Sequence, residues 1–281
     1  MSYPVDLNGT IMPEKDAVLP ANSRAVAYGE GCFETIRSYK GKFLRLQAHI
    51  DRLNLGLQKL NAGHEAHPQK IKERILRLLD ETGEPNHDFR IRIQAGLLGK
   101  AGVFGDFGEI FTLITATPID VTTKPVSLTV SETRKIPTNS LESSVKWSQY
   151  VSNMMALRKA KTAGFDDAIM LTQDGFVSET TIANIFWIKG DKIFTPSQSC
   201  DMLPGITRQI ILDALKAVSI SVTETKAELR ELSGADSVFL TNSVREIQAV
   251  SALDGNEFDL NNPILEVVKQ AFGKLKEKEL C

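Results

Sequence analysis

Apolar and polar residues follow two spacings along the chain, which predict many strands and a few helices. Between 89 and 94, apolar residues alternate with Arg90, Arg92 and Gln94, as they do in a half-buried strand. Between 48 and 60, apolar residues recur every three or four positions, as they do on the buried face of a helix. The same reasoning predicts helices over 71–79, 150–163 and 206–218 and strands over 34–38, 43–46, 109–116, 126–132, 166–172, 176–178, 185–188, 192–195, 219–223 and 237–241.

Glycine and proline mark the turns between these elements. Asn8-Gly9 and Lys40-Gly41 predict hairpins, because such pairs supply the positive φ angles of a tight turn. The segment from Thr117-Pro118 to Pro125 interrupts the pattern, since proline biases the residue before it away from helix. We therefore predict an α+β (mixed α/β) fold with a smaller α/β domain over 1–117, a linker over 118–125 and a larger strand-rich domain over 126–281.

Charge and composition argue against several kinds of partner. The 281 residues carry a net charge of −2 and a sequence pI of about 6.1, without the basic stripe that binds nucleic acid. No apolar run approaches the ~20 residues that span a membrane, and no signal peptide is visible. The three cysteines lack zinc-site spacing, so we expect no metal and a reduced, cytoplasmic protein.

Glycine recurs at every third residue from Gly96 to Gly108. A phosphate-binding P-loop is excluded, because Ala101 follows Gly99-Lys100 where that loop requires serine or threonine. Two interpretations stay open, a plain loop between two strands or a mobile lid over a site.

Four short segments carry residues suited to chemistry. Lys146 lies among serines and aromatics just before a predicted helix, and Glu179 lies between two predicted strands. Gly205 opens a predicted helix, whose free N–H groups and dipole favour an anion. The Thr-Asn-Ser segment at 241–243 offers further donors. Each also has an ordinary explanation when taken singly: a surface lysine, a solvated glutamate, a plain helix start and a turn.

Together with two earlier motifs, these segments resemble one enzyme family. From about Asn8 to Gly255 the chain is similar to the class IV aminotransferases, the fold type IV enzymes of pyridoxal 5′-phosphate (PLP). That family includes branched-chain aminotransferases, D-amino acid aminotransferases and aminodeoxychorismate lyases. The motifs occur in the order Tyr28-Gly29-Glu30-Gly31-Cys32-Phe33-Glu34, His49-Ile50-Asp51-Arg52-Leu53, Lys146, Glu179 with Asn184-Ile185-Phe186, and Gly205-Ile206-Thr207-Arg208.

The resemblance implies PLP as the cofactor and gives the matching residues their roles. Lys146 would hold PLP as a Schiff base and then move the proton between the reacting carbons. Glu179 would pair with the pyridine nitrogen and keep it protonated. Tyr150 would donate to the phenolic oxygen, with simple helix packing as the alternative. The phosphate would be bound by Arg52, by the backbone N–H groups of Ile206 and Thr207, and by donors from Asn242 and Ser243.

The residues that would bind the substrate are less sharply indicated. A carboxylate clamp is expected of an arginine, and the candidates are Arg37, Arg92 and Arg245, each of which could instead be structural. Arg92 lies nearer the place of the arginine in branched-chain enzymes. The Thr-Asn-Ser segment looks more like that of lyases or D-amino acid enzymes, and Gln149 replaces the family's usual asparagine.

Three functions remain open on this basis. The first is transfer of an amino group between an amino acid, branched-chain-like or of D configuration, and a 2-oxo acid. The second is cleavage of 4-amino-4-deoxychorismate to pyruvate and 4-aminobenzoate. The third, a binding protein that has lost its chemistry, is disfavoured because Lys146 and Glu179 are both present. The family also implies a homodimer, with the cofactor in the cleft between the domains and the second subunit helping to wall it.

Overall fold

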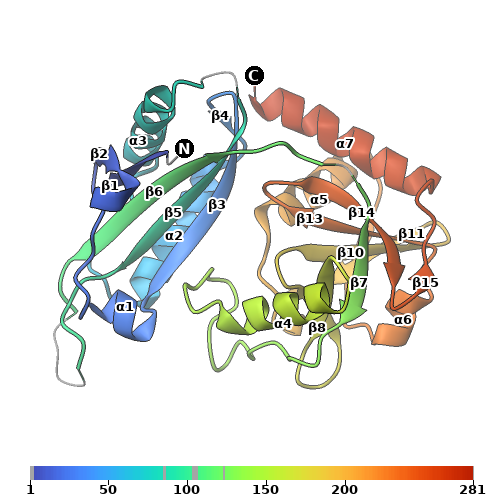
Figure 1. Ribbon diagram of the computed structural model, residues 1–281. Coiled ribbons are helices and arrows are strands. Elements are labelled where there is room, and N and C mark those ends of the chain that lie inside the picture. The colour runs from blue at the N-terminus through green and yellow to red at the C-terminus, as the bar shows by residue number, and fades with distance from the viewer. Residues whose placement is uncertain (1–2, 85–86, 103–106, 123, 281) are drawn as a thin grey trace. The chain divides into compact units, whose positions relative to one another are not determined.

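The computed structural model describes residues 3–84, 87–102, 107–122 and 124–280 (Figure 1). The chain divides into two compact units. The first extends to Asp120 and also includes Val145–Gln149, and the second comprises Val121–Ser144 and Tyr150–Glu279. None of the helices in the described part of the chain has the length and hydropathy needed to cross a membrane.

The first unit is built on an antiparallel sheet of six strands, in the order β2-β1-β6-β5-β3-β4. Asn8 and Gly9, with φ of 53° and 91°, join β1 to β2, and Lys40 and Gly41 join β3 to β4, so both predicted hairpins are confirmed. The strands are β1 (Pro4–Leu7), β2 (Thr10–Pro13), β3 (Gly31–Tyr39), β4 (Lys42–Phe43), β5 (Phe89–Leu97) and β6 (Ile110–Pro118).

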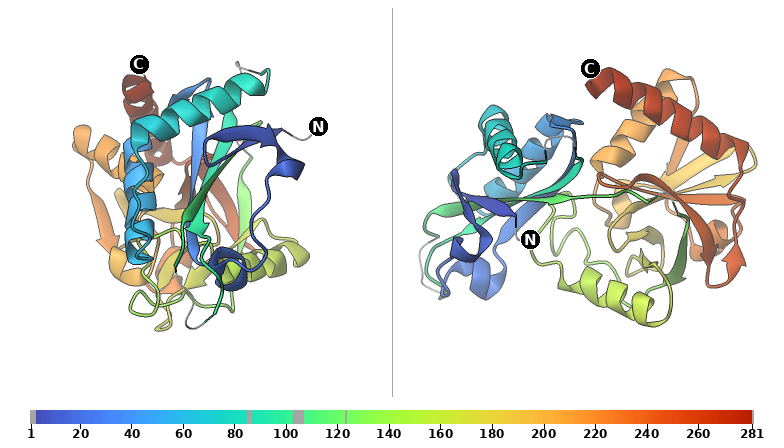
Figure 2. Two further views of the ribbon diagram at one scale, coloured as in Figure 1. Left: turned by 90° about the vertical axis from the view of Figure 1, so that its left-hand side faces the viewer. Right: turned by 45° about the horizontal axis from the view of Figure 1, so that its top comes forward.

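Two helices, α2 (Leu46–Lys59) and α3 (Pro68–Glu81), cover one face of this sheet (Figures 1 and 2). Both were predicted from their apolar spacing. The core between sheet and helices is formed by alternate strand residues and the inner helix faces, including Ile36, Ile91, Ile93, Ile50, Leu53 and Ile75. The short helix α1 (Arg24–Tyr28) precedes β3. Of the strand predicted over 43–46 only Phe43 lies in β4, and the rest of the prediction is wrong. The chain turns at Leu44 and at Arg45, which has φ of 51°, and enters α2 at Leu46.

The segment Val145–Gln149 pairs with the first residues of β3. The Phe33 N–H donates to the Lys146 carbonyl at 2.8 Å, and the Ser148 N–H donates to the Gly31 carbonyl at 2.9 Å. Gly56 lets α2 approach closely, because a Cβ there would lie 2.9 Å from both Cys32 Cβ and Val145 Cγ1. Val145 belongs to the helix-covered core, so the next side chain, Lys146, points to the opposite side of the sheet.

The second unit contains a mixed sheet of nine strands, in the order β12-β11-β10-β13-β14-β7-β8-β9 with β15 beside β14. Strand β9 also packs against β10, so the sheet curls toward a barrel. The strands are β7 (Val126–Val130), β8 (Asp167–Leu171), β9 (Val177–Thr180), β10 (Asn184–Lys189), β11 (Lys192–Pro196), β12 (Val222–Thr225), β13 (Ser237–Asn242), β14 (Glu246–Leu253) and β15 (Asn256–Glu257).

The helices of the second unit are α4 (Val151–Thr162), α5 (Ile206–Ala217), α6 (Leu229–Ser233) and α7 (Pro263–Leu280). The strand predicted over 219–223 is wrong in its first half. Ser219 has φ of 61° and ends α5 as a left-handed cap, so the chain becomes extended only at Val222. Strand β14 and helix α7 were not predicted.

Candidate functional site

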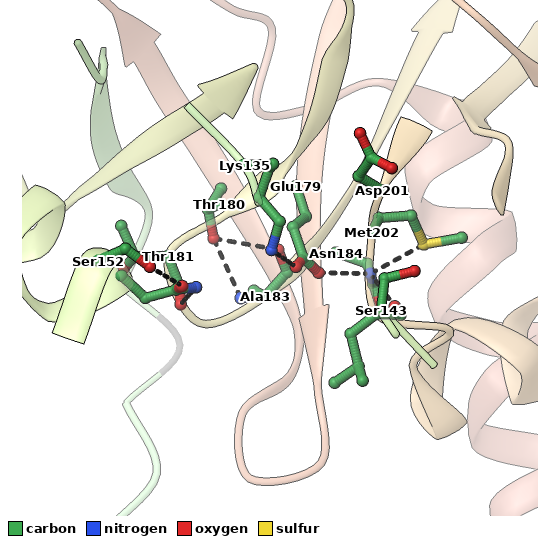
Figure 3. Close-up of polar contacts among 12 residues, drawn as sticks. Lys135, Ser143, Ser152, Glu179, Thr180, Thr181, Ala183, Asn184, Asp201 and Met202 are labelled. Atoms are coloured by element: carbon green, nitrogen blue, oxygen red, sulfur yellow. Dashed lines mark hydrogen bonds and ion pairs between the residues drawn. The ribbon is translucent and has the colours of Figure 1, made fainter. Parts of the chain in front are cut away.

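Glu179 lies on β9 and is almost fully buried (Figure 3). Its Oε1 accepts a hydrogen bond from Lys135 Nζ at 2.6 Å, and its Oε2 accepts one from Asn184 Nδ2 at 3.1 Å. A carboxylate in so dry a place is held by charge-assisted hydrogen bonds. Glu179 was predicted to lie between two strands, which is wrong, because β9 extends to Thr180 and includes it.

Asn184 connects this carboxylate to the start of α5. Besides Glu179, its Nδ2 contacts the Leu203 carbonyl at 2.8 Å and Met202 Sδ at 3.5 Å. A Cβ on Gly205 would lie 1.9 Å from Asn184 Oδ1, so only glycine fits there. The glutamate motif and the glycine motif, distant in the sequence, thus form one arrangement in the second unit.

The start of α5 has the features of an anion site. Gly205 is the N-cap, and no side chain in the described residues caps the first N–H groups, which include those of Ile206 and Thr207. Thr241 on β13 pairs with Asn184 on β10 and therefore faces the same side of the sheet. Its Oγ1 is buried without a hydrogen-bond partner among the described residues, which suits a group that accepts from it, such as a phosphate.

Asn242 and Ser243 follow directly at the end of β13. Asn242 Oδ1 accepts the N–H groups of Val244 at 3.0 Å and Arg245 at 2.8 Å, so this side chain shapes the turn into β14. Ser243 lies half-buried in that turn. The exposed Arg245 donates to Gln248 Oε1 at 3.0 Å.

Tyr150, the N-cap of α4, supports the loop between Glu179 and Asn184. Its hydroxyl donates to the Thr181 carbonyl at 2.7 Å, and Asn153 Nδ2 donates to the same carbonyl at 2.9 Å. The Thr181 hydroxyl in turn donates to Asp167 at 2.5 Å, and burial raises the pKa of that carboxyl. The Tyr150 hydroxyl therefore has a hydrogen-bond acceptor within the protein, while its predicted donation to the cofactor stays a prediction.

In the first unit, Lys146 and Arg92 meet at the ring of Phe33. Lys146 Nζ lies 4.8 Å and Arg92 Cζ lies 3.7 Å from the ring centroid. Phe33 and Arg92 come from the neighbouring strands β3 and β5, on the face away from α2 and α3. Two of the predicted site residues are thus brought together on a single sheet face.

Arg52 lies instead on the helix-covered side of this sheet, in a cluster with Glu34 and His49. Its Nε and Nη2 donate to the two Glu34 oxygens at 2.7 and 2.9 Å, and His49 Nδ1 lies 2.6 Å from Glu34 Oε2. Burial alone would raise the pKa of Glu34, but Arg52 and His49 outweigh it and lower the pKa to about 2. Burial lowers the pKa of His49, and Glu34 offsets part of that shift.

Arg37, the remaining candidate, is held by Asp88. Its Nε and Nη2 donate to Asp88 Oδ2 at 3.0 and 2.6 Å, and its guanidinium stacks over Tyr39 at 4.6 Å. Of the three candidate arginines, Arg92 is therefore the one whose recorded contacts place it beside Lys146.

Comparison with known proteins shows the family to which the chain belongs. The sequence pattern of the amino-transferase class IV family matches residues 31–253. The chain belongs to the class IV aminotransferase family. Aminodeoxychorismate lyase of Bacillus subtilis (strain 168) is 34% identical over 248 residues, which cover 86% of this chain and 83% of the relative. A putative branched-chain-amino-acid aminotransferase of Methanocaldococcus jannaschii is 30% identical over 281 residues, covering 97% and 93% of the two chains.

The fold of this class IV aminotransferase is also that of a solved relative. The branched-chain amino acid aminotransferase from Escherichia coli has a TM-score of 0.90, 25% identity and coverage of 100% of this chain and 96% of the other. The predicted family and fold class are confirmed, and so is the prediction of an aminotransferase-type enzyme. The relatives remain compatible with lyase chemistry as well.

Sequence reasoning about this class IV aminotransferase missed Lys135. It lies outside the family motifs, and 44 residues separate it from Glu179, so no local pattern indicates their contact. Thr241 was noted only as part of a segment. The glycine-rich stretch cannot be judged as a lid, because 103–106 lie outside the described residues.

Proposed function

We propose that this protein is a PLP-dependent aminotransferase that moves an amino group between an amino acid, branched-chain-like or of D configuration, and a 2-oxo acid. The observation that carries the proposal is the meeting of Lys146 and Arg92 at the Phe33 ring. An amine that can bond a carbonyl beside a guanidinium that can bind a carboxylate is what an amino acid or 2-oxo acid substrate requires.

The residues fit PLP in three respects. Glu179 is a buried carboxylate suited to a protonated ring nitrogen. The start of α5 offers the N–H groups of Ile206 and Thr207 to the phosphate. The buried Thr241 hydroxyl has no hydrogen-bond partner among the residues that the structure describes. Arg52, Asn242, Ser243 and Tyr150 complete the set that the family resemblance predicts, and their roles rest on that resemblance.

The mechanism assigns a task to each side chain. When bound, PLP supplies an electron sink for the carbon that loses its proton. Lys146 Nζ takes the proton from the substrate's α-carbon and delivers it to the reacting carbon of the cofactor. Glu179 accepts the hydrogen bond of the ring nitrogen. Arg92 binds the substrate carboxylate, and stacking on Phe33 orients its guanidinium.

The second candidate is cleavage of 4-amino-4-deoxychorismate to pyruvate and 4-aminobenzoate. It is favoured by the 34% identity to a Bacillus subtilis protein that carries this activity in its name. Both reactions would use Lys146 and Glu179 in the same way. They differ in what leaves the substrate, which depends on the groups around its side chain.

Absorbance of the purified protein with PLP separates these outcomes. If the band of the pyridoxal form converts to that of the pyridoxamine form with a D- or L-amino acid, the protein is a transaminase and its donor is known. If the band persists with every amino acid while pyruvate is released from aminodeoxychorismate, the lyase function is correct. A protein that retains no PLP absorbance after unbound PLP has been removed contradicts both.

We also propose that the protein is a cytoplasmic homodimer. The dimer rests on the family resemblance. The cytoplasm is supported by Cys32 and Cys200, which are buried free thiols. Light scattering of the purified protein tests the dimer, and a mass of one chain would contradict it. Cell fractionation tests the location, and recovery outside the cytoplasm would contradict it.

A further inference from the structure

Lys135, which neither the motifs nor the proposed function uses, is fixed to the strands around Glu179. Its N–H donates to the Leu171 carbonyl at the end of β8 at 2.9 Å, and its carbonyl accepts from Gln173 Nε2 at 2.9 Å. Both backbone groups are therefore held by the β8–β9 hairpin that also carries Glu179. Because the backbone of Lys135 is already fixed, only side-chain freedom is lost when its ammonium group binds the carboxylate.

The Lys135 side chain ends at the Glu179 carboxylate (Figure 3). The Nζ to Oε1 distance is 2.6 Å, and the two side chains are only 13% and 9% exposed. The ion pair between Lys159 and Glu132 is different, because at 2.9 Å its side chains are 66% and 85% exposed. Water screens the exposed pair, whereas in the buried pair each charge depends on its partner.

We propose that Lys135 is a positioning residue for Glu179, a resident cation that neutralises the carboxylate and then shares it with the ring nitrogen of the cofactor. The proposal rests on the proposed function, since it requires PLP. It adds a residue that sets how firmly Glu179 holds the ring. Asn184 cannot do this, because its amide is neutral and holds the other oxygen.

The net charge around Glu179 depends on Lys135 and on the cofactor. Without cofactor, Lys135 and Glu179 sum to zero, and a protonated ring then adds one positive charge. If Lys135 loses its charge, Glu179 is left with one uncompensated negative charge, and the protonated ring restores neutrality. Removal of the Lys135 charge should therefore lower the stability of the cofactor-free protein and increase the stabilisation that PLP provides.

The test compares the thermal midpoint of unfolding with and without saturating PLP. Lys135→Met keeps an unbranched side chain that is one atom shorter and removes its charge. We expect PLP to raise its midpoint by about 5 °C more than it raises that of the unaltered protein. Lys135→Arg should restore the normal increment. Lys159→Met, the matched control at the exposed pair, should leave it unchanged.

An increment in Lys135→Met equal to that in Lys159→Met would overturn the proposal, since Lys135 would then be an ordinary ion pair. If Lys135→Met does not fold, Glu179→Gln is compared with Lys135→Met/Glu179→Gln. Equal PLP dissociation constants support action through Glu179, and a tenfold difference contradicts it. If the unaltered protein binds no PLP, the proposed function fails first, and the role of Lys135 fails with it.

Discussion

Two buried glutamates, one in each unit, differ in how completely the protein satisfies them. Glu34 is fully buried, and both of its oxygens are held by Arg52 while one also contacts His49. Glu179 has one ammonium, from Lys135, and one neutral amide, from Asn184. Arg52 binds Glu34 through two nitrogens, so both oxygens of this carboxylate are already held by a cation. The Glu179 carboxylate can still accept a hydrogen bond from another cation, which a carboxylate that binds a cofactor requires.

The largest effect that separates them is on turnover. Glu179→Gln keeps the shape of the side chain but removes the charge that would hold a protonated ring. We expect kcat to fall by roughly 10³-fold. The unfolding free energy should also fall, because the buried Lys135 is left without its carboxylate. Steady-state kinetics and urea unfolding on the same preparation measure both. An unchanged kcat would mean that Glu179 has no part in the reaction.

Glu34→Gln should act mainly on stability. It leaves Arg52 and the buried His49 without their carboxylate, and breaking a buried pair costs about 3–5 kcal/mol. Urea unfolding measures this loss. A variant as stable as the unaltered protein would show that the cluster contributes no stability.

The pH dependence of stability sharpens the same contrast. The pKa of Glu34 falls from 4.5 in the unfolded chain to about 2 in the folded one, so its stabilisation is present above pH 4.5 and is lost as the pH falls toward 2. The loss amounts to about 3 kcal/mol. Unfolding free energies at pH 6, 4.5 and 2.5 should decline less in Glu34→Gln. Parallel curves would contradict the low pKa of Glu34.

The smallest effect is expected at Tyr150. Tyr150→Phe removes one hydrogen bond to the Thr181 carbonyl, which Asn153 continues to satisfy. We expect a loss of about 1 kcal/mol in unfolding free energy. A loss as large as that of Glu34→Gln would place Tyr150 in the structural core of the second unit.

The elements that the sequence predicted best are those with a local cause. Asn8-Gly9 forms its hairpin because the turn itself requires positive φ, and α2 and α3 follow from apolar spacing. Helix α7 also shows such a spacing, at Leu265, Val268 and Phe272, and could have been found. Strand β14 could not, because Gln248 is buried in it while Ile247 is only half-buried.

The candidate site was predicted only as far as motifs reach. Motifs identify Lys146, Glu179 and Arg52 by type and order. They do not reveal that Arg52 binds Glu34 or that Lys135 binds Glu179. They also do not reveal that Arg92 and Lys146 both lie over the Phe33 ring. Each of these is a contact between residues far apart in sequence, which depends on strand register and packing. Their roles toward the cofactor remain predictions.

The most direct test of the central claim is to find the lysine that bonds the cofactor. The protein is incubated with PLP, reduced with borohydride so that any Schiff base becomes a stable amine, digested and mapped by mass spectrometry, with Lys146→Ala as the control. We expect the phosphopyridoxyl group on Lys146, and no stoichiometric label in the variant. Stoichiometric label on another lysine, or none at all, would contradict the account.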